Sequence, residues 1–247
     1  MTSGPGSDYG TYEPARFSVS LALSRAIEVL FGNFFTIFGI SALASVPIGV
    51  YVWLEHNGMR SSGTGFVVTL LNAVLSALSE AMIVFATFQA LRRRGINPGE
   101  SIARGLQRFW PVIGASLLVG IITGIGFLLL IVPGLVALCV WYVTIPACVV
   151  EQLGPTESMS RSSDLTSGYR WPIFGAALLV GIVQVGGNAL INASLRRPGT
   201  LVAYAVVYFL WIALVRAYES VLSTIIYHDL RVAKEGIDIE QLASVFD

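Results

Sequence analysis

Two carboxylates lie inside long apolar runs, at the same distance from the end of each run. Glu80 comes before a Gln-Ala-Leu-Arg sequence that ends at Arg92. Glu219 comes, with identical spacing, before a His-Asp-Leu-Arg sequence that ends at Arg231. An ionisable side chain inside a membrane is costly, and it is a candidate for binding an ion or relaying a proton. Arg216 is the expected counter-charge for Glu219, one helical turn away, or for Glu80 on a neighbouring helix. Because one arginine cannot neutralise two carboxylates, we expect one acid to stay protonated or to face water.

Other polar side chains recur every third or fourth residue in the apolar runs, which places them along one face of a helix. They are Asn72, Ser76, Ser79, Glu80 and Thr87 in one run, Gln184, Asn188 and Asn192 in a second, and Arg216, Glu219, Ser220 and Ser223 in a third. Because polar faces avoid lipid, we expect the three to converge on a shared interior. Three interpretations stay open: hydrogen bonds between helices, a polar cavity or proton-linked path, and chemistry.

No catalytic motif accompanies these residues. The zinc-protease HExxH, the GxSxG elbow, the phosphate-binding loop and the dinucleotide fingerprint are all absent from the sequence. His56 and His228 stand alone in different regions. Cys139 and Cys148 point to roughly opposite faces of a helix, which disfavours a disulfide or a metal pair. We therefore expect a protein that is not an enzyme and has no metal or cofactor.

Membrane-spanning helices must hold the polar residues. Hydrophobic residues make up 55% of the chain and charged residues 12%, against about 25% charged residues in soluble domains. The net charge of zero argues against binding to nucleic acid. A helix needs about 20 residues to cross the hydrocarbon. The apolar runs then predict an all-α protein with six spans, at Asn33–Leu54, Phe66–Leu91, Trp110–Ile131, Gly134–Val150, Pro172–Leu195 and Leu201–Tyr227.

The long uncharged stretch between the third and fourth spans needs a turn. Pro133 and Gly134 are expected to form it, and Pro146 is expected to kink the fourth span. In the third span, a ladder of small residues predicts close packing against another helix. The ladder consists of Ser116, Gly120 and Gly124.

The basic residues predict the orientation. If both termini share one side of the membrane, that side carries Arg16, Arg25, Arg92, Arg93, Arg94, Arg104, Arg108, Arg161, Arg170, Arg231 and Lys234. Only Arg60, Arg196 and Arg197 fall on the other side. The positive-inside rule then places both termini in the cytoplasm, with the chain in the cell membrane. Some of these arginines either anchor their helices or contact anionic lipid headgroups: Arg92, Arg93, Arg94, Arg104 and Arg161.

Two connecting segments repeat each other. A Pro-x-Glu-Ser-x-x-Arg sequence ends at Arg104 and again at Arg161, and each leads into a Trp-Pro pair, at Trp110 and at Trp171. A weaker copy surrounds Arg25. We interpret the unit as a helix lying in the interface followed by a transmembrane hairpin. Within a single domain over 16–230, three copies in one orientation are expected, at about 16–94, 97–151 and 155–231.

The two ends of the chain are expected to lie at the membrane surface. Residues 1–15 are rich in Gly, Ser and Pro and predict a disordered tail. An apolar face from Phe17 to Phe31 predicts a helix lying in the interface. Within the C-terminal segment 231–247, Asp238 and Gln241 resemble a capping box, which predicts a short amphipathic helix over Ile239–Val245.

Several stretches of the chain resemble a known family. The run Leu130-Ile-Val-Pro-Gly134, the segment from Pro146 to Glu151 and the segment from Glu157 to Gly168 resemble a family of uncharacterised prokaryotic six-helix membrane proteins. That family is related to the membrane domain of some glycerophosphoryl diester phosphodiesterases. The ending from Tyr227 to Ile239 is similar to its terminal signature. The resemblance implies a six-helix membrane fold and no active-site residue, since the phosphodiesterase chemistry belongs to a separate barrel domain.

Two functions are expected ahead of an intramembrane enzyme. The first is a non-enzymatic membrane scaffold, lipid-organising protein or complex subunit. The second is a carrier of a lipid or small solute, with a polar site around Glu80, Arg216 and Glu219. The expected partners are membrane lipids and either another protein or a second copy of the chain.

Overall fold

The described part of the chain is almost entirely helical. The computed structural model describes residues 17–56, 62–92, 95–196 and 200–236. Its helices are α1 (Val19–Gly32), α2 (Phe34–His56), α3 (Ser62–Leu91), α4 (Pro98–Gln107), α5 (Phe109–Leu129), α6 (Ile131–Val140), α7 (Thr144–Val150), α8 (Pro155–Thr166), α9 (Arg170–Leu195) and α10 (Leu201–Glu235). Six stretches among them are long and apolar enough to cross a membrane, the fourth being α6 and α7 together. The predicted all-α membrane architecture is thereby confirmed at this level.

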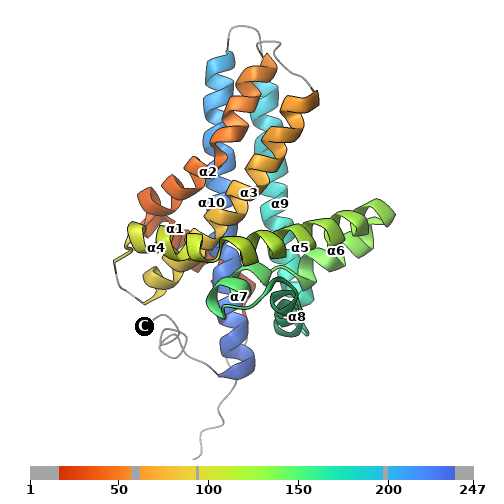
Figure 1. Cartoon of the computed structure of the whole chain (residues 1–247). Helices are drawn as coiled ribbons and strands as arrows, with labels where there is room; N and C mark the ends of the chain where they lie inside the picture. The colour runs from red at the N-terminus through yellow and green to blue at the C-terminus, as the bar shows by residue number, and fades with distance from the viewer. Residues whose placement is uncertain (1–16, 57–61, 93–94, 197–199, 237–247) are drawn as a thin grey trace, which may run out of the picture.

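The helix α10 is the axis of the molecule. Its 35 residues correspond to about 52 Å, well beyond the hydrocarbon thickness of about 30 Å. Its N-terminal half forms a bundle with α2, α3 and α9 (Figure 1). Its C-terminal half is enclosed by α1, α3, α7 and α8, and there the side chains of Leu222, Ile226 and Tyr227 are fully buried. The densest core therefore lies at one end of the molecule, below the bundle.

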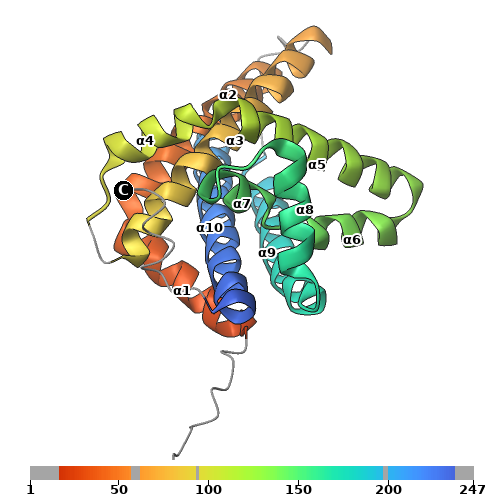
Figure 2. The ribbon, with the colours of Figure 1, turned by 60° about the horizontal axis from the view of Figure 1, so that its bottom comes forward.

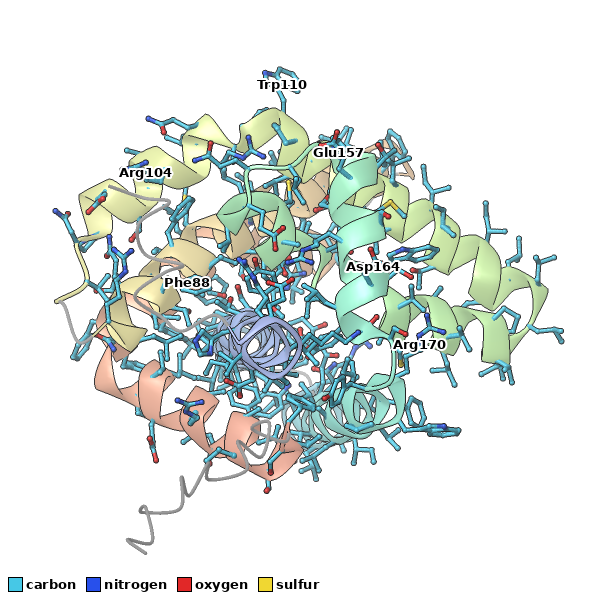
Figure 3. All side chains as sticks on the ribbon, turned by 90° about the horizontal axis from the view of Figure 1, so that it is seen from below. Phe88, Arg104, Trp110, Glu157, Asp164 and Arg170 are labelled. Atoms are coloured by element: carbon cyan, nitrogen blue, oxygen red, sulfur yellow. The ribbon has the colours of Figure 1, made fainter. Side chains whose placement is uncertain are left out.

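The hairpin of α5 and α6 runs across the other long helices. Viewed along α10, the helices α9 and α10 are seen end-on, whereas α5 and α6 lie in the plane of the view (Figure 3). The same hairpin projects sideways from the bundle in Figures 1 and 2. The element order does follow the predicted unit, with a short helix before each pair of long ones. The direction of the second hairpin differs from that of the other long helices, and the hairpin contacts α3, α7, α8 and α9.

The turn at the tip of this hairpin lies earlier than predicted. Helix α5 ends at Leu129, Leu130 is extended, and Pro133 falls within the first turn of α6, where proline is tolerated. Gly134 serves close packing instead: its backbone lies 3.0 Å from where a Cβ on Gly126 would stand. The predicted turn at Pro133 and Gly134 is therefore wrong by about one helical turn.

The small-residue ladder of α5 does not pack as predicted. A Cβ placed on Gly120 or on Gly124 would meet no described atom within 4 Å. Ser116 Oγ is buried without a hydrogen-bond partner among the described residues. Gly126, outside the ladder, makes the close contact with α6. The ladder faces away because the hairpin leaves the bundle.

The fourth span is broken rather than kinked. Helix α6 ends at Val140 and α7 begins at Thr144, with Trp141, Tyr142 and Val143 forming a turn. Pro146 has no N–H to donate to the carbonyl four residues earlier, which belongs to Tyr142. The helix therefore opens at Tyr142, earlier than the predicted kink.

Short helices form where the repeated sequence predicts them, at α4 and α8. Their position at a membrane surface stays a prediction. In α4 the Asn97 Oδ1 accepts from the Glu100 N–H at 3.3 Å. In α8 the Glu157 carboxylate accepts from the Gly154 N–H at 3.0 Å. The tryptophan after each helix stands out from the molecule, with Trp110 78% and Trp171 83% exposed.

The helix α1 lies within the stretch from Phe17 to Phe31 for which a helix was predicted, and its position in the membrane interface stays a prediction. Some sequence predictions concern residues that lie outside the described ranges: the tail 1–15, Arg16, Arg60, Arg93, Arg94, Arg197 and the terminal helix Ile239–Val245 with Asp238 and Gln241.

Candidate functional site

Glu80 and Glu219 line one cavity. It has a volume of about 450 Å³ and lies where α3, α9 and α10 meet the end of α6. We call it the acidic cavity. Its polar lining consists of Ser76, Ser79, Glu80, Tyr142, Gln184, Arg216, Glu219, Ser220 and Ser223. The polar faces predicted on three separate helices thus meet here.

Arg216 is bound to neutral side chains and not to the acids. Its guanidinium donates to Asn72 Oδ1 at 3.1 Å and to Ser76 Oγ at 2.6 Å, both on α3. Among the described residues no carboxylate lies within ion-pair distance of it. The predicted ion pair of Arg216 with Glu219 or Glu80 is therefore wrong: the guanidinium reaches across to α3. It acts as a hydrogen-bonded link between α10 and α3.

The two carboxylates have no such link. Within the described ranges, neither Glu80 nor Glu219 accepts a hydrogen bond or forms an ion pair through its side chain. Each is partly buried, and the two lie close enough to interact electrostatically. Arg216 contributes an attractive interaction to Glu219 only through space. With both acids ionised, the cavity therefore has an excess of one negative charge.

Hydroxyl groups complete the wall around the acids. Ser79 donates to the Ser76 carbonyl at 2.9 Å and Ser223 donates to the Ser220 carbonyl at 3.0 Å. Each of these hydroxyls donates its hydrogen bond to a carbonyl of its own helix, so its oxygen lone pairs can still accept from a ligand. Tyr142 enters from the break between α6 and α7. The sequence analysis missed this tyrosine, and the only signal for it was its position four residues before Pro146.

The polar face of α9 is divided between two places. Gln184 lines the acidic cavity. Asn192 instead accepts from the Tyr204 hydroxyl at 3.1 Å and donates to the Asn188 carbonyl at 2.7 Å, toward the far end of the bundle. The Asn188 Oδ1 is buried without a partner among the described residues. The shared polar interior predicted from the sequence therefore includes Gln184, but it does not include Asn188 or Asn192.

A charged network lies at the opposite end of α10. Arg161 donates from Nε to both oxygens of Glu151 at 2.8 Å and also pairs with Glu235. Arg231 contacts Glu235 at 2.9 Å and Glu151 at 3.6 Å. The Tyr227 hydroxyl donates to Glu151 at 2.8 Å. We call this the charge clamp; it joins α8 and the end of α7 to α10.

The clamp changes the role expected for Arg161. Burial lowers the pKa of the Arg161 guanidinium, but its hydrogen bonds to Glu151 and Glu235 outweigh burial and hold that pKa above its ordinary value. An arginine so engaged is a structural residue and not an anionic-lipid contact. Arg104, by contrast, lies on the exposed face of α4, 4.0 Å from Glu100. In the view from below in Figure 3, the labelled Arg104 lies toward the rim of the molecule.

The chemistry open to the acidic cavity follows from its donors and acceptors. No group of three metal-ligating side chains occurs in the described part of the chain. Two carboxylate groups and several hydroxyl oxygens can accept from a cation or hold a proton. No nucleophile paired with a base lines the cavity.

Comparison with known proteins does not assign the chain to a family. No model of a protein family matches the chain, and neither the curated proteins nor the solved structures give a match. The six-helix family remains a resemblance in sequence pattern. The residues that carry its terminal signature, Tyr227 and Arg231, lie in the charge clamp.

Proposed function

We propose that the protein is a carrier that binds a positively charged or proton-bearing small solute or lipid headgroup in the acidic cavity. The observation that carries this proposal is the pair of carboxylates, Glu80 and Glu219, which line a cavity and have no partner in the described structure. In this proposal the charged end of α10 faces the cytoplasm of a prokaryotic cell, as the distribution of basic residues predicts.

The alternative role, in which polar side chains hold neighbouring helices together, fits Arg216 and not the acids. This role requires hydrogen bonds from one helix to the next, each worth about 0.6 to 2 kcal/mol in a membrane. Arg216 makes two such bonds to α3. Glu80 and Glu219 make none with their side chains, although an ionised group in this position is costly. A bound cation or proton supplies the missing compensation.

The test is native mass spectrometry of the chain in lipid nanodiscs. We expect a retained ligand in the native protein and its loss in Glu80→Gln and in Glu219→Gln. Glu28→Gln is the matched control, because Glu28 is an exposed acid on α1. Equal ligand occupancy in all four proteins would contradict the proposal, and so would a native protein without any bound ligand.

A second candidate, a subunit of a membrane complex, rests on the projecting hairpin. Its tip is apolar on all sides, with Leu128 85% exposed and Leu130 and Ile131 near 70%. The unpacked Gly120 and Gly124 give its α5 a surface on which another helix can approach closely. The same mass spectra test this role through the protein mass. A homo-oligomer or stoichiometric partner that dissociates in Gly124→Leu, but not in Gly175→Leu at an unhindered site on α9, would support it.

A further inference from the structure

The described part of the molecule is wide at one end and narrow at the other. Toward the charge clamp, the helices α1, α4, α5, α6, α7 and α8 lie around α10, whereas among the described helices only α2, α3, α9 and α10 reach the opposite end (Figure 1). The hairpin of α5 and α6 extends to one side of α10, and α1 and α4 lie on the other side (Figure 2). The two ends therefore differ in cross-section.

The hairpin has the surface of a segment immersed in hydrocarbon. The sequence has no charged residue from Phe109 to Val150. A helix that lies among headgroups presents a charged or polar face to water. Around the tip of the hairpin, by contrast, the exposed side chains are apolar. They include Ile121, Ile125, Leu128, Leu130, Ile131 and Val132. This surface fits a position below the headgroups, among acyl chains.

The helix α2 indicates the depth of the hairpin. It follows α1 directly, and its 23 residues correspond to about 34 Å, which is enough to cross the hydrocarbon. The hairpin lies near the height at which α2 begins (Figure 1). Trp110, in the first turn of α5, is exposed, as expected of a tryptophan at headgroup depth. In a bilayer crossed by α2, the hairpin then lies in the leaflet nearer the charge clamp and not in the other leaflet.

We propose that the α5–α6 hairpin is a membrane wedge: it inserts among the acyl chains of one leaflet, so that the protein favours membrane that is convex on the charge-clamp side. The 21 residues of α5 and the 10 of α6, lying flat, cover roughly 450 Å² of that leaflet. Four upright helices occupy roughly 300 Å² in either leaflet. The hairpin thus adds more area than the whole bundle, on one side only, and bending of the membrane relieves the mismatch.

Acyl chains cover the tip of this hairpin more completely than a second protein can. A protein interface has an apolar core and a polar rim on one face. At the tip, the successive residues Leu128, Leu129, Leu130 and Ile131 are all exposed, and successive residues point in different directions. One partner helix cannot cover them all. A second chain can approach α5 at Gly120 and Gly124 without covering the tip.

The experiment uses membrane tubes pulled outward from giant vesicles that contain the protein. The outer surface of a tube is strongly convex, whereas the vesicle is nearly flat. In a chain with Cys139→Ser and Cys148→Ser, a fluorescent membrane-impermeant maleimide added outside labels Ser167→Cys in molecules whose charge-clamp end faces outward. It labels Gly63→Cys in molecules of the opposite orientation. We expect the Ser167→Cys label to be several-fold denser on the tube than on the vesicle, and the Gly63→Cys label to be depleted from the tube.

A matched pair of variants tests whether the hairpin causes this sorting. Leu130→Asp places a charge at the tip, which drives the tip out of the acyl region, and is expected to abolish the difference between the two labels. Leu130→Ala keeps the tip apolar and is expected to keep the difference. Because Leu130 is exposed, neither variant removes a core contact, and thermal unfolding in detergent checks that both are folded. Glu80→Gln is expected to sort like the native chain, so the wedge is tested independently of the ligand of the acidic cavity.

Equal tube densities of the two labels in the native chain would overturn the proposal. That result is expected if the hairpin crosses the bilayer, or if a second chain replaces the lipid around its tip. Enrichment of the Gly63→Cys label would overturn it too, since the wider end would then lie on the concave side. Sorting that persists unchanged in folded Leu130→Asp would rule out the hairpin as its cause.

Discussion

At the scale of single residues, the long apolar helices hold two kinds of charged side chain. The Arg216 guanidinium is saturated by Asn72 and Ser76, whereas Glu80 and Glu219 face a cavity without partners. A charged group that is hydrogen-bonded stabilises the helix pair that it joins, and removing one side leaves the other side unsatisfied. A charged group without a partner does the opposite, since its burial opposes folding. The two kinds should therefore respond differently to neutralisation.

We predict that Arg216→Gln lowers the stability of the protein by about 1 to 3 kcal/mol, because Asn72 and Ser76 lose their donor. Glu80→Gln and Glu219→Gln are expected to leave stability unchanged or to raise it, because each removes an unpaired charge. Thermal unfolding in detergent measures all three, with Arg170→Gln as the exposed control. A loss of stability in the two glutamate variants that matches the loss in Arg216→Gln would show that the acids are structural after all.

At the scale of elements, Pro146 decides where the fourth span opens. The break from Trp141 to Val143 delivers Tyr142 to the acidic cavity, and the missing N–H of Pro146 is its physical cause. Pro146→Ala restores a donor for the Tyr142 carbonyl and is expected to close the helix and turn Tyr142 away. Ligand retention at the acidic cavity should then fall while thermal stability is kept or rises. Pro133→Ala, at the same helical position in α6, is the control, and loss of retention there too would remove the special role of the break.

The charge clamp is the second feature that acts at the scale of elements, because it holds the surface helix α8 on the end of α10. Arg161→Met removes one of the two arginines that contact both Glu151 and Glu235, and leaves Arg231 as the other. We expect a loss of about 1 to 2 kcal/mol, which is below the value for a fully buried pair because the groups are partly exposed to water. A double-mutant cycle with Glu235→Gln should give a coupling energy of about 0.5 kcal/mol or more. Additive effects in that cycle would mean that the pair contributes no stability.

At the scale of the whole molecule, the sequence predicts the features that depend on the length and composition of a single segment. Six spans and three surface helices follow from runs of apolar residues and from Pro and Glu at helix starts, and these signals lie within each segment. The partner of Arg216 and the entry of Tyr142 depend on which helices meet. Asn72 and Arg216 are far apart in the chain, and no spacing rule relates them. The direction of the α5–α6 hairpin also depends on contacts between helices, since the hairpin packs against α3, α7, α8 and α9.

The direction of the α5–α6 hairpin determines whether the tip of the hairpin can be reached from water. If α2, α3, α9 and α10 cross the bilayer together, a hairpin lying across them keeps its apolar tip within the membrane. In a chain with Cys139→Ser and Cys148→Ser, the variant Leu130→Cys should then resist a membrane-impermeant maleimide applied from either side. Gly63→Cys and Ser167→Cys, at opposite ends of the long helices, should each react from one side only. Labelling of Leu130→Cys from the same side as Gly63→Cys would show that the hairpin crosses like the other two, as three parallel repeats require. Protection favours the sideways hairpin, whose apolar surface is then available to lipid or to another helix.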